Sequence, residues 1–267
     1  MENTIANQLP TDIAFEKQLG QLATWVRVMR QAGLPIEEAL QMPIDDPEMR
    51  KRLVRFWNSG GYESTMTQTT MTQKLARAIG IPVFGIEEAV QHFGVKPTRA
   101  QLSALAEIPF TEAELRECKD THVLVAVFPM SIIEIRGKVP ANQRLFCDQD
   151  WYNKESFAKD RGEAAWHLVR KTPVTNSTSK TWDEQQALLA KDGETPTARV
   201  MVYTIIGHFL ATGERLFENP YVRCLGVDSD GRRVYVGDFV SSGLSVSGGW
   251  GACRFSSIGL ASARKLS

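Results

Sequence analysis

Apolar residues recur at regular intervals through a segment that is otherwise rich in serine and glycine, from residue 231 to residue 267. Because the side chains of a strand alternate between two faces, such spacing places every second residue in a core and leaves its neighbours outside. Serine and glycine are weak strand formers, so their abundance indicates an exposed face and adaptable loops on a rigid frame. The apolar positions are Val234, Val236, Phe239, Leu244, Val246, Trp250, Ile258 and Leu260.

Residues 1–119 are expected to form a helical N-terminal region. An apolar residue recurs every three or four positions between Asp12 and Gly33, which predicts one helix with these residues at its ends. A linker is predicted near residues 58–73, where Thr, Ser and Gly replace large aliphatic residues. Further helices are expected over residues 47–57, 74–79, 87–93 and 99–107. Three Thr residues are each followed three positions later by Gln or Glu, which predicts capping boxes at Thr98, Thr111 and Thr181.

From residue 120 onward the pattern is mixed, which predicts an α+β fold. Strands are expected over residues 122–128, 132–136, 221–227, 232–239, 243–247 and 258–266. Helices are expected over residues 156–170 and from Thr195 to Gly213. The strand at 122–128 and the terminal strand at 258–266 are both apolar, and we expect them to share a sheet. Asp228–Gly231 predicts a hairpin turn rather than a calcium loop, since the twelfth position holds Phe239 where a calcium loop needs glutamate.

Composition excludes several classes of protein. The 31 basic and 31 acidic residues cancel, so nothing in the net charge favours nucleic acid or an anionic membrane as a partner. The longest apolar run, Val123 to Phe128, is far too short to span a bilayer. The N-terminus has no basic-then-apolar pattern of a signal peptide, so a cytoplasmic protein is expected, with export by another route left open.

No pattern of a catalytic, metal or cofactor site is present. The four cysteines form no CxxC pair and are expected to be reduced. The four histidines are scattered, and the motifs of dinucleotide binding, phosphate loops, zinc proteases and serine hydrolases are missing. We therefore predict no catalytic residue, no metal and no cofactor.

Four segments carry a resemblance to a known family. They are THVLVAVFPMSIIEIRGKV (Thr121–Val139), WHLVRKTPVTNSTSKTWDEQQALL (Trp166–Leu189), TPTARVMVYTIIGHFLATGERLF (Thr195–Phe217) and the ending IGLASARKLS. In this order they resemble the variable (target) protein of a diversity-generating retroelement, over about residues 81–267. The resemblance implies a C-type-lectin-like domain over residues 120–267, with a mixed, mainly antiparallel sheet and two helices.

In such proteins a reverse transcriptase copies a template with errors at adenines, and the copy replaces the end of the target gene. AAY codons become NNY codons, which cannot encode Lys, Glu, Gln, Met or Trp. The resemblance implies a variable region at about residues 233–258 with these fixed positions: Val234, Val236, Gly237, Phe239, Gly243, Leu244, Val246, Trp250, Arg254 and Ile258. The positions implied to vary and to bind a ligand are Tyr235, Asp238, Val240, Ser241, Ser242, Ser245, Ser247, Gly248, Gly249, Gly251, Ala252, Cys253, Phe255, Ser256 and Ser257, and none of them is an excluded type.

The implied function is ligand binding without catalysis, through a hypervariable surface that recognises a partner, expected to be a protein. The segments 240–242 and 251–257 are expected to converge at one end of the sheet, and Trp250 is expected to be buried. The chain has no EPN, QPD or WND triplet, so the calcium-dependent sugar site of animal lectins is not expected.

Two alternatives stay open at this point, as do the identity of the ligand and the oligomeric state. The first is a regulator that binds DNA through helices within residues 74–107. The second is an oxidase of the formylglycine-generating type, which shares this general fold and uses cysteines. Against the oxidase, Cys253 falls at a variable position and Cys224 has no cysteine within a few residues.

Overall fold

The computed structural model describes residues 71–140 and 143–265, together with Thr24 and Arg27. Residues 71–140 and 143–265 belong to one compact unit, Thr65–Ser267, and the functional boundary expected at residues 119/120 stays a prediction. Thr24 and Arg27 are helical. The rest of the helices expected before residue 58, and residues 58–70 of the expected linker, lie outside the described residues.

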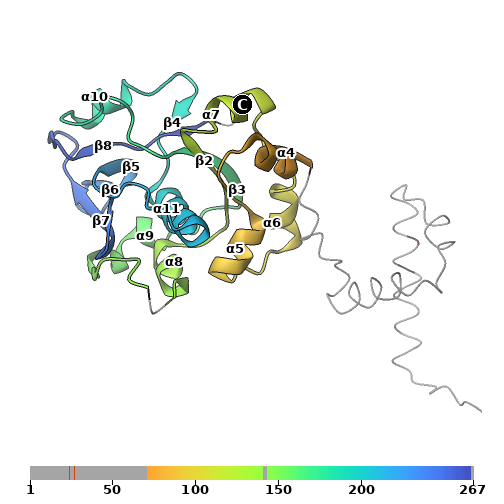
Figure 1. Ribbon diagram of the computed structural model, residues 1–267. Helices are drawn as coiled ribbons and strands as arrows, with labels where there is room; N and C mark the ends of the chain where they lie inside the picture. Colours follow the sequence, from red (N-terminus) through yellow and green to blue (C-terminus); the bar gives the residue numbers. More distant parts are fainter. Residues whose placement is uncertain (1–23, 25–26, 28–70, 141–142, 266–267) are drawn as a thin grey trace, which may run out of the picture. The chain divides into compact units, whose positions relative to one another are not determined.

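The described part of the chain has a mixed α+β fold with two sheets and eight α-helices (Figure 1). The first sheet has the order β1-β2-β3-β9-β4, in which only the β1–β2 pair is parallel. Its strands are β1 (Val83–Phe84), β2 (His122–Val127), β3 (Ala165–Arg170), β4 (Gly193–Glu194) and β9 (Ala263–Arg264). The α+β class and the mixed, mainly antiparallel pairing are confirmed, but the strands form two sheets, not one.

The second sheet has the order β7-β6-β5-β8, in which only the β5–β8 pair is parallel. Its strands are β5 (Tyr221–Val227), β6 (Arg233–Val240), β7 (Gly243–Gly249) and β8 (Ile258–Leu260). The terminal segment expected as one strand is therefore two strands in different sheets. β9 shares a sheet with β2, as expected for the end of the chain, but β3 lies between them, and β8 pairs in the second sheet.

Helix α11 (Ala198–Thr212) lies between the two sheets and packs against β1 and β2 on one side and β5 and β6 on the other (Figure 1). Every residue from Ala198 to His208 is buried, the polar Arg199, Thr204 and His208 included, because the helix faces a sheet on each side. Its N-cap is Thr197, two residues after the expected start, and Gly213 ends it in the left-handed conformation. Gly207 permits close packing, because a Cβ there would lie 2.9 Å from the ring of Phe84.

The remaining helices are α4 (Met71–Ile79), α5 (Ile86–Phe93), α6 (Arg99–Ala104), α7 (Glu112–Cys118), α8 (Ile132–Lys138), α9 (Ser156–Lys159) and α10 (Trp182–Gln186). Of these, α4 to α7 lie beside the first sheet, α8 and α9 lie at the bottom of the view, and α10 lies next to β8 (Figure 1). The capping boxes predicted at Thr98, Thr111 and Thr181 are confirmed. Helix α4 begins at Met71, so the last three residues of the expected linker are helical, and α6 ends at Ala104 rather than at residue 107.

Two expected elements are of the wrong type. The alternating residues 132–136 form helix α8 instead of a strand, because Ser131 and Glu134 make a fourth capping box that starts a helix there. The helix expected over 156–170 is a single turn, α9, followed by strand β3. Gly162, with a φ of 53°, lies between them in a left-handed conformation that interrupts a helix. As a result, four helices rather than two fall between residue 120 and the end of the described chain.

Candidate binding surface on the second sheet

Strands β6 and β7 present one face to the core and the other outward. The inward side chains of Val234, Val236, Leu244 and Val246 are completely buried. Of the ten positions implied to be fixed, eight are buried. Trp250 and Arg254 are the exceptions: the Trp250 side chain is 56% exposed, and exposed Arg254 donates to Glu184 Oε1 at 2.7 Å. The prediction that Trp250 is buried is wrong, because the chain leaves the sheet at Gly249 and Trp250 begins a surface loop.

The fifteen positions implied to vary are mostly open to solvent. Only Ser245 and Gly249 are buried. The exposed positions are Ser241, Ser242, Ala252, Cys253, Ser256 and Ser257. The half-buried positions are Tyr235, Asp238, Val240, Ser247, Gly248, Gly251 and Phe255.

Aromatic rings gather on the outward face of the second sheet. The rings of Tyr221 and Tyr235 meet edge to face, with centroids 5.2 Å apart. A Cβ at Gly249 would lie 3.2 Å from Tyr235 and 3.4 Å from Phe255, so both rings lie over this glycine. The guanidinium of Arg233 lies 4.2 Å from the ring centre of Trp182, beside them. Tyr221 and Trp182 were not among the predicted site residues, since both lie far from the variable region in sequence.

The loop of residues 250–257 turns its main chain inward and most of its side chains outward. Its carbonyl oxygens accept hydrogen bonds from the rest of the domain: those of Gly251, Phe255 and Ser257 accept from the amides of Trp182, Ser179 and Tyr221 at 2.8–2.9 Å. The side chains of residues 252–254, 256 and 257 are exposed. The loop is thus held mainly by its main-chain carbonyls, and the exceptions among its side chains are Arg254, which binds Glu184, and half-buried Phe255.

Two buried polar side chains lie beneath this loop. Arg223, on the outward face of β5, donates to the carbonyl of Cys253 at 2.7 Å and to that of Lys180 at 3.0 Å. Gln185 accepts from Arg223 at 3.0 Å and donates to the carbonyls of Ser177 and Ile258. Burial lowers the pKa of Arg223 from its ordinary value. Neither residue was predicted, because single buried polar residues in α10 and β5 leave no pattern in the sequence.

The 250–257 loop and the turn that joins β6 to β7 lie at opposite ends of strand β7. Val240 and Gly243 pair at the start of β7, whereas Trp250 follows its end. A strand of seven residues is about 20 Å long, so Val240–Ser242 do not converge with Gly251–Ser257 as expected. Ser241 instead lines a separate open cavity of about 430 Å³ near the end of α11, with Arg215 among its other lining residues.

Three of the candidate positions are constrained by their neighbours. Ser245 accepts from Gln149 Nε2 at 3.2 Å, because residues 145–151 run along the free edge of β7. A Cβ at Gly248 would lie 2.8 Å from the buried carboxylate of Asp228, and one at Gly249 would press on the aromatic rings above it. Substitution at Gly248 and Gly249 requires neighbouring atoms to move, unlike substitution at the exposed loop positions Ala252, Cys253, Ser256 and Ser257.

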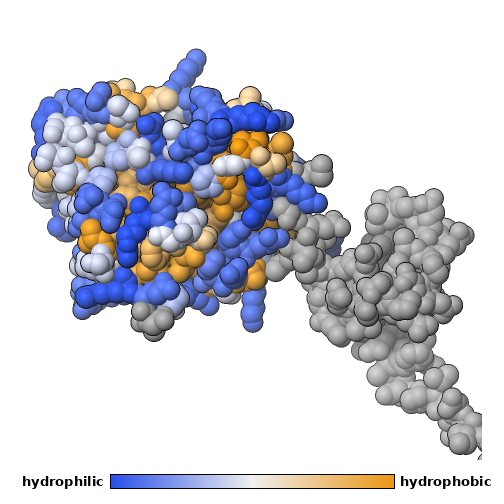
Figure 2. Space-filling view, viewed as in Figure 1, coloured by the Kyte–Doolittle hydropathy of each residue, from blue (hydrophilic) through white to orange (hydrophobic). Residues whose placement is uncertain are grey.

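Among the arginines near the site, Arg232 and Arg254 are paired with carboxylates, and Arg233 lies against the ring of Trp182. Arg232 binds Asp228 at 2.8 Å and Arg254 binds Glu184 at 2.7 Å. In Figure 2 the surface over β5 and β8, at the left, is mostly pale, between the two ends of the hydropathy scale, as serine and glycine are. The character of this face is therefore small, polar and aromatic rather than charged.

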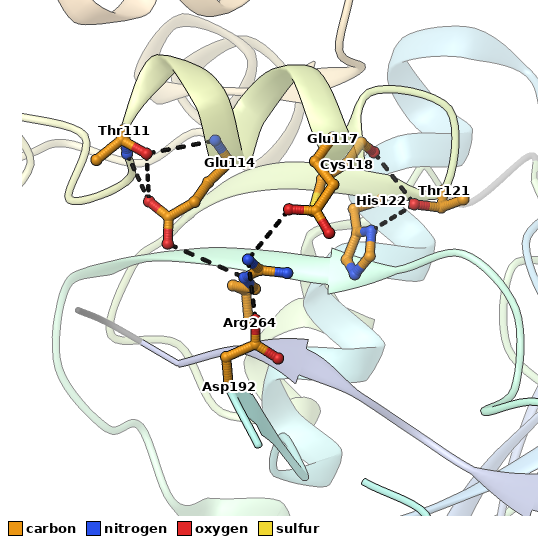
Figure 3. Close-up of polar contacts among 8 residues, drawn as sticks. All are labelled: Thr111, Glu114, Glu117, Cys118, Thr121, His122, Asp192 and Arg264. Carbon is orange, nitrogen blue, oxygen red and sulfur yellow. Dashed lines mark hydrogen bonds and ion pairs between the residues drawn. The ribbon is translucent and has the colours of Figure 1, made fainter. Parts of the chain in front are cut away.

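A second polar cluster ties α7 to the ends of β4 and β9. We call it the Arg264 junction: Arg264 lies between three carboxylates, 2.9 Å from Asp192, 3.3 Å from Glu117 and 4.0 Å from Glu114 (Figure 3). The thiol of Cys118 is close by, and burial raises its pKa. A raised thiol pKa opposes formation of a nucleophilic thiolate at Cys118.

Several titratable side chains of the described residues are buried in surroundings that disfavour their charged forms. Burial lowers the pKa of His122 and of His167 to about 4, so both are neutral near pH 7. Cys224 is completely buried, where burial raises the pKa of its thiol. Within residues 71–140 and 143–265, His, Cys, Asp and Glu nowhere gather in a group that could hold a metal ion.

Two of the helices considered for DNA binding, α4 and α5, make contacts within the domain. Helix α5 contacts α11, and Phe93 of α5 lies with its ring centre 4.8 Å from that of Tyr203. On α4, Arg77 pairs with Glu88 at 2.7 Å. Glu88 thus neutralises the charge of Arg77, and the apolar face of α5 is buried against α11.

Comparison of the chain with protein-family models, with curated proteins and with solved structures gave no match. No helix in the described part of the chain combines the length and the apolar character needed to cross a membrane.

Proposed function

We propose that this protein binds a partner through the outward face of its second sheet and the 250–257 loop, and that a retroelement diversifies the side chains there. The domain would be a C-type-lectin-like binding domain. One observation carries the proposal: along a single segment, residues 234–258, the core is filled by one set of positions while thirteen of the fifteen interleaved candidate positions keep contact with solvent. Substitution at exposed positions typically changes stability by no more than about 0.5 kcal/mol.

A protein partner fits the chemistry of this face best. Tyr, Trp and Arg are the residues that most often dominate protein interfaces. Tyr221, Tyr235 and Phe255 form a ring cluster on the sheet, and exposed Trp250 adjoins the same loop. These rings supply anchors, and the small polar residues around them supply an adaptable rim.

The two alternative functions draw no support from the geometry of their proposed residues. An oxidase needs an accessible cysteine pair, whereas Cys224 is completely buried. For DNA binding, the apolar face of α5 is packed against α11, and Arg77 of α4 is paired with Glu88. Binding without catalysis therefore remains the proposal.

A display library tests the proposed surface. Four exposed loop positions, Ala252, Cys253, Ser256 and Ser257, are randomised in the whole chain and selected against one purified, folded protein. The matched control library randomises four exposed helix positions, Ala100, Ser103, Ala104 and Ala113. We expect binders from the loop library alone, with affinity lost when Tyr235 or Phe255 is replaced by Ala. Binders arising equally from both libraries, or from neither, would contradict the proposal.

The diversification itself has a separate test in the genome. Next to a reverse transcriptase gene we expect a near-copy of the coding sequence for residues 233–265 that differs mainly at adenines. A neighbourhood with no such copy would leave a binding surface of fixed sequence and would remove the retroelement from the proposal.

A further inference from the structure

Arg223 is a positively charged residue that is completely buried in the second sheet. It is 0% exposed, although it stands on the outward face of β5, because the 250–257 loop covers it. Its Nε atom has no hydrogen-bond partner among the described residues. Burial of a cation is costly unless close contacts compensate it, so the contacts of its two Nη atoms must explain its presence.

Those contacts are almost all to main-chain oxygen atoms. Nη2 donates to the carbonyl of Cys253 at 2.7 Å and to that of Trp250 at 3.5 Å. Nη1 donates to the carbonyl of Lys180 at 3.0 Å. The planar guanidinium presents several donors in a fixed geometry, so one side chain can hold two segments at once. Arg223 therefore joins the loop to the segment that precedes α10.

Gln185 orients this guanidinium and extends its reach. Its Oε1 accepts from Arg223 at 3.0 Å, and its Nε2 donates to the carbonyls of Ser177 at 2.7 Å and Ile258 at 3.1 Å. Arg223 thus holds the start of the loop, at Trp250 and Cys253, while Gln185 holds its end at Ile258. The only loop side chain that takes part is Phe255, whose ring centre lies 5.6 Å from the guanidinium carbon.

We infer that Arg223, held by Gln185, is a positioning residue that sets the main-chain path of the 250–257 loop independently of the side chains the loop carries. The inference rests on the proposed function, because independence from side chains is useful only where they vary. Arg223 lies outside the variable region and is the same in every variant. It would therefore keep positions 252, 253, 256 and 257 in the same place whatever side chains they carry.

Native-state hydrogen exchange tests the inference, with Arg223→Lys as the variant. Lysine keeps the charge but offers a single ammonium in place of the fork. We expect the amides of Ser179, Trp182, Tyr221 and Cys253, which hydrogen-bond to loop carbonyls or lie within the loop, to exchange about tenfold faster or more. Amides in β2, such as those of Val123 and Val125, should change little.

Arg199→Lys is the matched control. Arg199 is also buried, also has an unpartnered Nε, and also donates to a main-chain carbonyl, that of Phe128, but at the start of α11. In Arg199→Lys, the exchange rates of the four loop-linked amides should rise no more than those of other amides in the domain. Equal loss of protection at those amides in both variants would show a general stability effect and would overturn the inference.

A second variant decides the matter even if Arg223→Lys does not fold. With Arg223 retained, Ala252, Cys253, Ser256 and Ser257 are replaced together by Asn, and the same four amides are measured. Exchange within about threefold of the original protein is expected, and a loss as large as that expected for Arg223→Lys would overturn the inference. The library above can fail while these results hold, in which case the binding proposal falls and the role of Arg223 stands.

Discussion

The 250–257 loop and the Arg264 junction both join segments that are far apart in the sequence, but they use different atoms to do so. In the loop, main-chain carbonyls accept from amides and from buried Arg223. In the junction, the contacts run between the side chains of Arg264 and three carboxylates (Figure 3). A main-chain contact survives substitution of the residue that makes it, whereas a side-chain ion pair does not. The two regions should therefore respond in opposite ways to mutation, salt and pH.

The largest effect is expected beneath the loop. Gln185→Leu leaves the buried carbonyls of Ser177 and Ile258 without their donor and removes a contact of Arg223. We expect a loss of about 2–4 kcal/mol in the free energy of unfolding, measured by denaturant titration. Its neighbour Gln186 is the control, because the Gln186 side chain hydrogen-bonds only to Thr195. Gln186→Leu should lower the free energy of unfolding by about 1 kcal/mol or less. Similar losses in the two variants would mean that the buried hydrogen bonds of Gln185 add no more stability than the hydrogen bonding between Gln186 and Thr195.

A smaller loss is expected at the junction, and it should depend on salt. Arg264→Gln leaves Glu114, Glu117 and Asp192 as unopposed negative charges, which we expect to cost about 1–2 kcal/mol at low ionic strength. Raising the salt concentration to about 1 M shortens the screening length to about 3 Å and should remove much of the difference from the original protein. Arg116→Gln, which breaks only an exposed pair with Glu112, should cost about 0.5 kcal/mol or less. A loss for Arg264→Gln that salt leaves unchanged would contradict an electrostatic junction.

Acid should weaken the ion pair between Arg254 of the loop and Glu184. The Thr181 amide and then Arg254 lower the pKa of Glu184 from its ordinary value of 4.5 to about 2. A carboxylate with a lowered folded-state pKa contributes stability above its ordinary pKa, and this contribution is lost as the pH falls from about 4.5 toward 2. We expect Glu184→Gln to flatten the pH dependence of unfolding in that window, and Arg254→Gln to flatten it in part. An unchanged slope in Glu184→Gln would show that the link is absent in solution.

The smallest effect is expected on the loop surface itself. Replacement of Ala252, Cys253, Ser256 and Ser257 together by Asn should change stability by no more than about 0.5 kcal/mol per site, because all four side chains are exposed. The melting temperature should stay within a few degrees. The matched change in the junction, Glu114, Glu117 and Asp192 replaced together by their amides, should cost more. If the loop variant loses more stability than the junction variant, the comparison between the regions fails.

Short-range patterns in the sequence predicted much of this fold. Capping boxes at Thr98, Thr111 and Thr181 were visible because their two residues lie three positions apart. The alternation of Val234, Val236, Leu244 and Val246 similarly predicted which face of the sheet is buried. The same spacing is present at Ser131 and Glu134, but the alternation of residues 132–136 predicted a strand there, and this prediction is wrong.

The unpredicted features depend on residues that meet only in the folded chain. Arg223 and Gln185 are 38 residues apart, and the loop they hold begins 27 residues after Arg223. Trp250 was assigned to the core by its apolar character, but the chain leaves β7 at Gly249 and exposes it. Likewise, the β6–β7 turn and the 250–257 loop lie at opposite ends of β7 because of where that strand begins and ends. The composition of the segment does not determine these two points.

The division of the terminal segment between the sheets also governs when the domain can form during synthesis. Tyr221 of β5 pairs with Ile258 of β8, and Leu168 of β3 pairs with Arg264 of β9. Contacts between residues so distant in the sequence form late and slow the folding of a chain. On the ribosome, helix α11 and the β5–β7 meander can appear early, but both sheets wait for the same few residues to leave the exit tunnel. Until then the growing chain exposes two unfinished sheet edges, which is the period when it most needs protection by chaperones.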